Sequence, residues 1–176
     1  SLFFIGEIFT TLPIQTADVL HPDRCGTCTR CLDICPTKAI ESPRKLNATK
    51  CISYWTIESK TPAPEPLRAQ IGDWLFGCDL FQTVCPWNEK AFGPTMKTLT
   101  TPTKPNNRQD LIKELRHILQ SSNKELEKQW KDTPLERAGG RGLKKNAVIV
   151  AANLTLTELK SDIEQLQYST PQLQSL

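Results

Sequence analysis

The sequence predicts an α+β protein in two parts, a cysteine-rich module with little regular structure and a run of short antiparallel helices. Three observations predict this division. All seven cysteines lie between Cys25 and Cys85. A stretch of prolines and threonines at 93–107 follows them, and apolar residues recur at helical spacing only after that stretch. Only 38% of the 176 residues are hydrophobic, so we expect the cysteines to add to the stability of a small core.

The composition excludes several classes of protein. A formal net charge of +3 and 13 prolines describe a mildly basic, turn-rich chain rather than a coiled coil, a collagen or a fully disordered protein. The apolar stretch from Ser1 to Leu20 contains Glu7 and Asp18, so it is not a membrane-spanning helix, and it lacks the basic start of a signal peptide. We therefore expect a cytoplasmic protein without a membrane partner, where closely spaced cysteines bind metal more often than they form disulfides.

The chain divides into four segments. Residues 1–22 form an N-terminal segment, expected to be the remnant of an upstream domain with a short helix ending near Pro13. The chain begins with Ser rather than Met, and the apolar run Leu2–Ile5 has no evident partners, which predicts missing material upstream. Residues 23–92 form the cysteine-rich module, 93–107 form a stiff Pro/Thr-rich linker, and 108–176 form the helical domain.

One motif in the module carries chemistry. The run from Cys25 to Pro36 has the spacing C-x2-C-x2-C-x3-C-P, the pattern of bacterial ferredoxins, in which the first three thiolates bind one cluster and the fourth binds another. The run therefore predicts a two-cluster, bacterial ferredoxin-like module. By the same crossed rule, a 4Fe–4S cluster is assigned to Cys25, Cys28, Cys31 and Cys85, and a second cluster to Cys35, Cys51 and Cys78.

The second cluster is one thiolate short. Phe81 stands at the place where a fourth cysteine is expected, three residues after Cys78. Three alternatives stay open: a three-iron cluster, a cubane whose fourth iron takes water or an oxygen such as that of Asp79, or an empty site. Zinc is disfavoured because one tetrahedral ion cannot use so many crowded thiolates.

The helical domain is predicted from periodicity and caps. Apolar residues at helical spacing predict a helix over Asp110–Gln120, and Ser122 with Glu125 and Thr133 with Glu136 fit capping boxes. Pro134 fits a first helical position, and the nearby glycines predict a flexible break at 139–142. Two further apolar faces are expected, formed by Leu143, Ala147, Val150, Ala151 and Leu154 and by Leu156, Leu159, Ile163 and Leu166.

Four basic residues, Arg137, Arg141, Lys144 and Lys145, cluster around one helix start. Such a patch can neutralise phosphates of a nucleic acid with little base specificity, although a run of charges is often only a solvated face. His117 is expected at the surface, and His21 lies near the first cluster. Trp55, Trp74 and Trp87 are expected to shield the clusters from water.

The chain resembles the epoxyqueuosine reductases over most of its length. The matching segments are Phe3–Ile8, Cys25–Cys31, Cys35–Thr37, Cys51–Tyr54, Ile71–Gly72, Phe76–Asp79, Gln82–Asn88, Pro134–Arg137, Arg141–Leu143 and Asn146–Ala147. The resemblance implies a cobalamin-dependent oxidoreductase that reduces epoxyqueuosine to queuosine in tRNA, the last step of queuosine biosynthesis. It also implies that Phe81 replaces a family cysteine.

Members of that family carry a cobalamin-binding domain with the catalytic acid, then a two-cluster module, then HEAT-like helices that grip tRNA. The resemblance implies that this chain starts after the first domain, so no catalytic residue is assigned to it. Its expected roles are electron transfer to cobalamin and part of the grip on a queuosine-type anticodon arm. Ser53 is similar to a position that contacts cobalamin, and the expected partners of this monomer are tRNA, an electron donor and the missing domain.

Two other hypotheses come from different classes. One is a stand-alone ferredoxin-type electron carrier or a degenerate, non-catalytic fragment that never meets cobalamin. The other is the related corrinoid reductive dehalogenases, which the basic helical tail disfavours.

Overall fold

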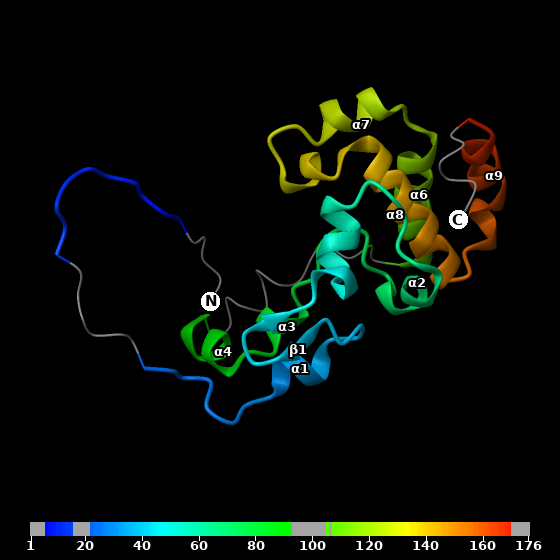
Figure 1. Cartoon of the computed structure of the whole chain (residues 1–176). Coiled ribbons are helices and arrows are strands. Elements are labelled where there is room, and N and C mark those ends of the chain that lie inside the picture. The colour runs from blue at the N-terminus through cyan, green and yellow to red at the C-terminus, as the bar shows by residue number, and fades with distance from the viewer. Residues whose placement is uncertain (1–5, 16–21, 93–104, 106, 170–176) are drawn as a thin grey trace.

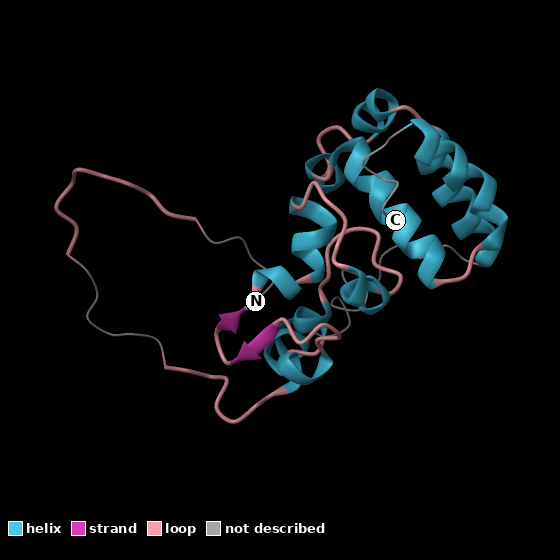
Figure 2. Ribbon diagram, turned by 45° about the vertical axis from the view of Figure 1, so that its right-hand side comes forward, coloured by secondary structure: helices cyan, strands magenta, loops and turns pink. Residues whose placement is uncertain are grey.

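A computed structural model describes residues 6–15, 22–92, 105 and 107–169 (Figures 1 and 2). This part of the chain is mostly helical, and its one sheet is a two-stranded antiparallel hairpin, drawn in magenta in Figure 2. The hairpin and the short helices around it come from the cysteine-rich residues. The longer helices come from the C-terminal residues and pack beside them (Figure 1).

The cysteine-rich part consists of short elements, as expected from its prolines and glycines. They are α1 (Arg30–Ile34), β1 (Ile40–Ser42), β2 (Lys45–Leu46), the 3-10 turn η1 (Ala48–Lys50), the π-helical turn η2 (Tyr54–Glu58), α2 (Glu65–Ile71), α3 (Leu80–Thr83) and α4 (Pro86–Phe92). Pro64 and Pro66 set the start of α2, because proline is tolerated where a helix has no use for the amide hydrogen.

The C-terminal part consists of α6 (Arg108–Gln120), α7 (Asn123–Gln129), the 3-10 turn η3 (Pro134–Arg137), α8 (Gly139–Asn153), the 3-10 turn η4 (Thr157–Leu159) and α9 (Lys160–Ser169). The capping box of Ser122 and Glu125 is confirmed, with both hydrogen bonds formed. The apolar stripe of α6 is also confirmed, because Ile112, Leu115, Ile118 and Leu119 are buried.

Two predictions about η3 and the start of α8 are wrong. Thr133 and Glu136 form no capping box: the Thr133 hydroxyl donates to the Trp130 carbonyl at 2.6 Å, and the Glu136 carboxylate accepts from the Asp132 amide. The glycines form no flexible break, since Gly139 begins α8. Gly140 permits a close approach of α8 to α7, because a Cβ at this position would lie 2.7 Å from the Asn123 Cα.

The N-terminal segment differs from its prediction. Residues 6–15 contain no helix and are exposed, with Ile8 and Phe9 each 92% accessible (Figure 1). The expected helix ending near Pro13 is therefore wrong over these residues, while 1–5, 16–21 and nearly all of the linker lie outside the described residues. In the part of the chain that is described, none of the helices has the length and apolar character needed to cross a membrane.

Helix α8 joins the two parts of the chain through its apolar side chains. Its buried residues, including Leu143, Ala147 and Val150, complete the main core with residues of α6, α7 and α9. On another side of the same helix, Ile149 packs into a second core with Ile52 and Ile71 of the cysteine-rich part. The two parts therefore share a continuous interface along α8.

Polar side chains of α8 hold the same interface. The Lys145 ammonium donates to the carbonyls of Trp55 at 2.6 Å, Ser59 at 2.8 Å and Thr61 at 3.3 Å. The neighbouring Asn146 amide donates to the Thr56 carbonyl at 2.7 Å and to the Leu75 carbonyl at 2.8 Å. The η2 turn is thus attached to α8 by two adjacent residues.

Candidate metal centre

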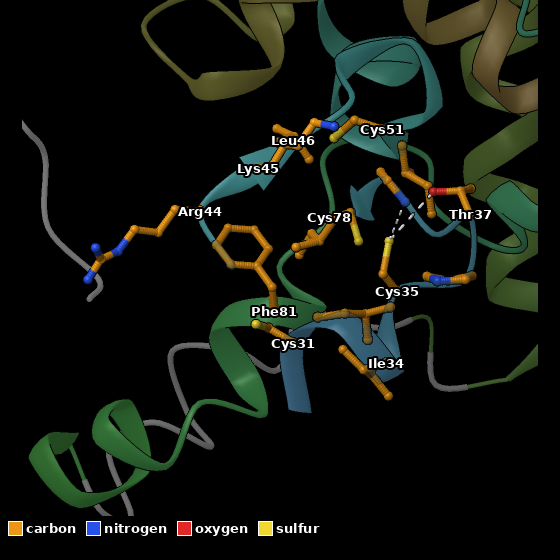
Figure 3. A pocket seen from close by; sticks show the side chains of 15 residues that line it. Cys31, Ile34, Cys35, Thr37, Arg44, Lys45, Leu46, Cys51, Cys78 and Phe81 are labelled. Atoms are coloured by element: carbon orange, nitrogen blue, oxygen red, sulfur yellow. Dashed lines mark hydrogen bonds between the residues drawn. The ribbon is translucent and has the colours of Figure 1, made fainter. Parts of the chain in front are cut away.

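A cavity of about 290 Å³ lies between α1, the hairpin, η1 and α3 (Figure 3). Its wall contains the three thiols assigned to the second cluster, those of Cys35, Cys51 and Cys78. The sulfur atoms of Cys35 and Cys78 point toward each other in Figure 3. The structure therefore brings together three predicted ligands that are up to 43 positions apart in the sequence.

The hydrogen bonds around Cys35 favour the thiolate form of its side chain. The Ala39 amide donates to its sulfur at 3.2 Å, and the buried Thr37 hydroxyl lies 3.7 Å from it. Burial raises the pKa of Cys35, but hydrogen bonds from the Ile40 amide, the Thr37 hydroxyl and the Ala39 amide outweigh burial and hold this pKa below its ordinary value. Hydrogen bonds of this kind favour the charged form of a ligand.

Cys51 and Cys78 are positioned by one buried hydroxyl. Thr56 donates to the carbonyl of Ile52, the residue after Cys51, at 2.8 Å, and accepts from the amide of Gly77, the residue before Cys78, at 3.0 Å. Gly77 has a φ of +68°, a left-handed conformation that suits glycine. The turn before Cys78 thus depends on Gly77 and on Thr56.

The charges at this cavity favour a bound cationic centre. Burial raises the pKa of Cys78, and the negative charges of Cys51 and Cys35 raise it further. Three thiolates that repel one another in one partly buried cavity are stabilised when cationic metal lies between them. The donor set therefore fits an iron–sulfur cluster with three protein ligands.

Phe81 occupies the remaining side of the cavity. Its ring is part of the wall and is 42% exposed, and it extends from α3 toward the cavity in Figure 3. Helix α1, which carries Cys31, packs on α3, so Cys31 also lines this cavity. The wall thus contains four thiols, and the second site is one ligand short when Cys31 is assigned to the first cluster.

The cysteines assigned to the first cluster lie before and in α1 and between α3 and α4. Cys25 and Cys28 are exposed, while Cys31 and Cys85 are half-buried. A turn joins the first two, in which the Cys28 amide donates to the Cys25 carbonyl at 3.1 Å. The Trp87 indole donates to the Arg24 carbonyl at 2.9 Å, which ties the chain next to Cys85 to the start of the ferredoxin motif.

No three His, Cys, Asp or Glu side chains within the described ranges converge closely enough to hold a single metal ion. Of the tryptophans, Trp55 donates to the Thr49 carbonyl at 2.8 Å, Trp74 packs against the second core and Trp87 is 44% exposed. His117 is exposed as expected, and His21 lies outside the described residues.

The basic patch is smaller than predicted. Lys145 is only 1% exposed and its ammonium is bound to three carbonyls, so its assignment to an RNA-binding surface is wrong. Arg141 is exposed and Lys144 is half-buried. Arg137 is exposed but forms an ion pair with Glu58 at 2.8 Å, an acid from a distant segment that the sequence did not indicate.

Ser53, the position implied by the family to contact cobalamin, is half-buried and directly precedes the π-helical turn η2. Turns of this kind are frequent at functional sites. Thr56, Lys145 and Asn146 hold η2 and the cysteine loops, a role that the sequence did not indicate for them. The available signal was a Lys-Asn pair directly before the apolar run 147–152.

Comparisons with known proteins agree with this geometry. The model of a family described as a 4Fe-4S double cluster binding domain matches residues 24–88. The chain is 38% identical to the epoxyqueuosine reductase of Pseudomonas aeruginosa over 157 residues, which cover 89% of the chain and 42% of that relative. It is 53% identical to the reductase of Xanthomonas campestris pv. campestris over 93 residues, covering 52% and 25%.

The solved structure of epoxyqueuosine reductase from Bacillus subtilis superimposes with a TM-score of 0.71 at 32% identity, over 89% of this chain and 41% of the other. The chain belongs to the epoxyqueuosine reductase family. Another solved member of the family, in complex with an epoxyqueuosine-modified tRNA-Tyr stem loop, has a TM-score of 0.67 at 31% identity, over 85% and 38%.

The chain spans less than half the length of these epoxyqueuosine reductases. The part that it matches includes the double-cluster domain, so two iron–sulfur sites are present in this chain. The ligand sets derived above account for all of its seven cysteines.

Proposed function

We propose that this chain is the iron–sulfur and tRNA-holding part of an epoxyqueuosine reductase, which reduces epoxyqueuosine to queuosine in tRNA. The observation that carries the proposal is the extent of the structural likeness. At 32% identity it covers 89% of the chain and so includes both the cysteine-rich part and the helices. A stand-alone ferredoxin-type carrier needs only the former, and is therefore not favoured.

In this proposal, residues 23–92 form the ferredoxin-like module and 108–176 a HEAT-like domain, joined by a linker at 93–107. Cys25, Cys28, Cys31 and Cys85 bind the first cluster, and Cys35, Cys51 and Cys78 bind the second. Cobalamin, when bound, supplies a reducible cobalt centre. Ser53 would contact that cofactor, from the start of a turn that Lys145 and Asn146 hold in place.

The exposed ends of the module suit its partners. Cys25 and Cys28 are accessible, which leaves the first cluster open to an electron donor or acceptor from outside the chain. We place the protein in the cytosol, where tRNA is modified, and expect it to act as a monomer together with the cobalamin-binding region of the family.

The experiment that tests this function measures electron transfer from the clusters to cobalamin. The chain, with its clusters reduced and the reductant removed, is mixed with oxidised cobalamin under anaerobic conditions. We expect the corrinoid absorption spectrum to change to that of a reduced form as the clusters are oxidised. If the corrinoid spectrum stays unchanged while the same preparation reduces a small redox dye, the chain is a general electron carrier and the proposal fails.

The remaining basic patch is the proposed phosphate contact. Reversing two of its charges with Arg141→Glu and Lys144→Glu is expected to weaken binding of a tRNA anticodon stem loop at low salt by about tenfold or more, and to lower the salt dependence of binding. Arg137 is left in place because its loss would also break the ion pair with Glu58.

The matched control is Lys113→Glu with Lys160→Glu, on α6 and α9, which changes the net charge by the same amount. Lys160 loses only an exposed 4.0 Å pair with Glu164 one turn along the same helix, which contributes little. Both proteins are compared with the unchanged chain by filter binding over a range of salt concentrations. Equal losses in the two variants would show that the patch contributes only its net charge, and would contradict a specific phosphate contact.

A further inference from the structure

The cavity wall contains four thiols, those of Cys31, Cys35, Cys51 and Cys78. A four-iron cubane with full protein ligation needs four donor side chains, and the assignment of Cys31 to the first cluster leaves three for the second. The ring of Phe81, on α3, lines this cavity (Figure 3). A phenyl ring has no lone pair to give to iron.

Nothing else among the described residues of the cavity wall replaces the missing ligand. Cys31 is assigned to the first cluster, and the Thr37 hydroxyl is engaged with the Cys35 sulfur. Arg44 and Lys45 are cations, and Lys45 pairs with Glu41 at 3.2 Å. Asp79 is exposed and is not part of the wall, so its carboxylate is not placed to bind iron there.

The rest of the wall is poorly suited to a water ligand. It is mostly aliphatic, with contributions from Ile34, Ala39, Ile40, Leu46, Ile52 and Leu80. A buried water needs two or more polar partners, and an apolar ring and aliphatic side chains provide none. A fourth iron beside the Phe81 ring would therefore have no protein ligand, and these side chains would not hold a water on it.

We propose that the second site holds a cluster of three irons and four sulfides, with one thiolate each from Cys35, Cys51 and Cys78. The corner that a fourth iron would fill faces the ring of Phe81. The proposal rests on the ligand sets given under the proposed function. It differs from the two four-iron clusters that the double-cluster family description implies.

Magnetic resonance and iron analysis test the proposal on the full chain prepared without oxygen. A three-iron cluster is paramagnetic when oxidised, whereas an oxidised four-iron cluster gives no signal. We expect the oxidised protein to contain about seven irons per chain and to give a signal of about one unpaired spin per chain, from one four-iron and one three-iron cluster. In Phe81→Cys, we expect the oxidised signal to disappear, the iron content to rise by about one, and the signal of the reduced protein to increase.

The control is Phe81→Leu, which keeps an apolar residue without a thiol and is expected to retain the oxidised signal. A four-iron cluster can lose one iron through damage, so the same signal in Phe81→Cys would indicate damage and overturn the proposal. About eight irons with no oxidised signal, or about four irons, would also overturn it. Failure to reduce cobalamin with these spectra intact would instead contradict only the proposed function.

Discussion

Replacing Lys145 by methionine is expected to lower the free energy of unfolding by about 3 kcal/mol, because three buried or partly buried carbonyls lose a charged donor. Lys145 is 1% exposed, and its ammonium donates to the carbonyls of Trp55, Ser59 and Thr61. Methionine has a similar length and keeps the aliphatic contacts, so the loss comes from hydrogen bonds and not from a cavity. In a chain of 176 residues, this corresponds to a fall in the melting temperature of roughly 6–12 °C.

The control for this change is Lys144→Met, one residue earlier in the same helix. Lys144 is half-buried, so methionine at this position retains the packing of the aliphatic part of the lysine side chain. We expect its effect to stay below about 0.5 kcal/mol. Thermal unfolding of both variants, followed by circular dichroism on cluster-loaded protein, separates the two results. Equal melting temperatures would mean that the three carbonyls do not depend on Lys145.

The size of this effect depends on pH. Burial, and to a smaller degree the cation of Lys60, lowers the pKa of Lys145 from 10.5 to about 8. Between these values the unfolded chain keeps a proton that the folded chain has released, so this residue adds stability as the pH rises. The difference in melting temperature between the unchanged chain and Lys145→Met is therefore expected to increase from about pH 7 to about pH 10.

The double-cluster module could be predicted because the spacing of its first four cysteines is local. A run of three cysteines two residues apart reflects the geometry of a cluster directly, and the stripe and caps of α6 and α7 follow from helical periodicity. The folded cavity brings Cys51 and Cys78 to Cys35 and also contains Cys31, so the crossed assignment of the ligands stays a prediction. The absence of a thiol at Phe81 was likewise visible in the sequence.

The errors concern residues whose role depends on distant parts of the chain. A lysine is rarely buried, and the three carbonyls that hold Lys145 are 84–90 positions away. Gly140 lies in α8, where its missing Cβ allows the helix to approach Asn123, a contact that no local pattern shows. At Thr133 the hydroxyl donates to the Trp130 carbonyl instead of capping the next helical turn, because such local bonds compete with caps.

The crossed assignment of ligands predicts different losses from Cys85→Ser and Cys51→Ser. Cys85 lies between α3 and α4, outside the wall of the cavity that contains Cys35. The bond from the Trp87 indole to the Arg24 carbonyl ties the chain two residues after Cys85 to the Cys25 loop. Cys51 lies in the wall of that cavity. Each serine removes one thiolate from one cluster only.

With Cys85→Ser we expect the first cluster to be lost, leaving about three irons and the signal of the oxidised three-iron cluster. With Cys51→Ser we expect about four irons, no signal in the oxidised chain and a signal after reduction, because the four-iron cluster remains. Iron analysis and magnetic resonance of the two variants, prepared in parallel, give both quantities. Since an uncrossed arrangement would assign Cys85 to the same cluster as Cys51, loss of the oxidised signal in both variants would show that the ligands are not crossed.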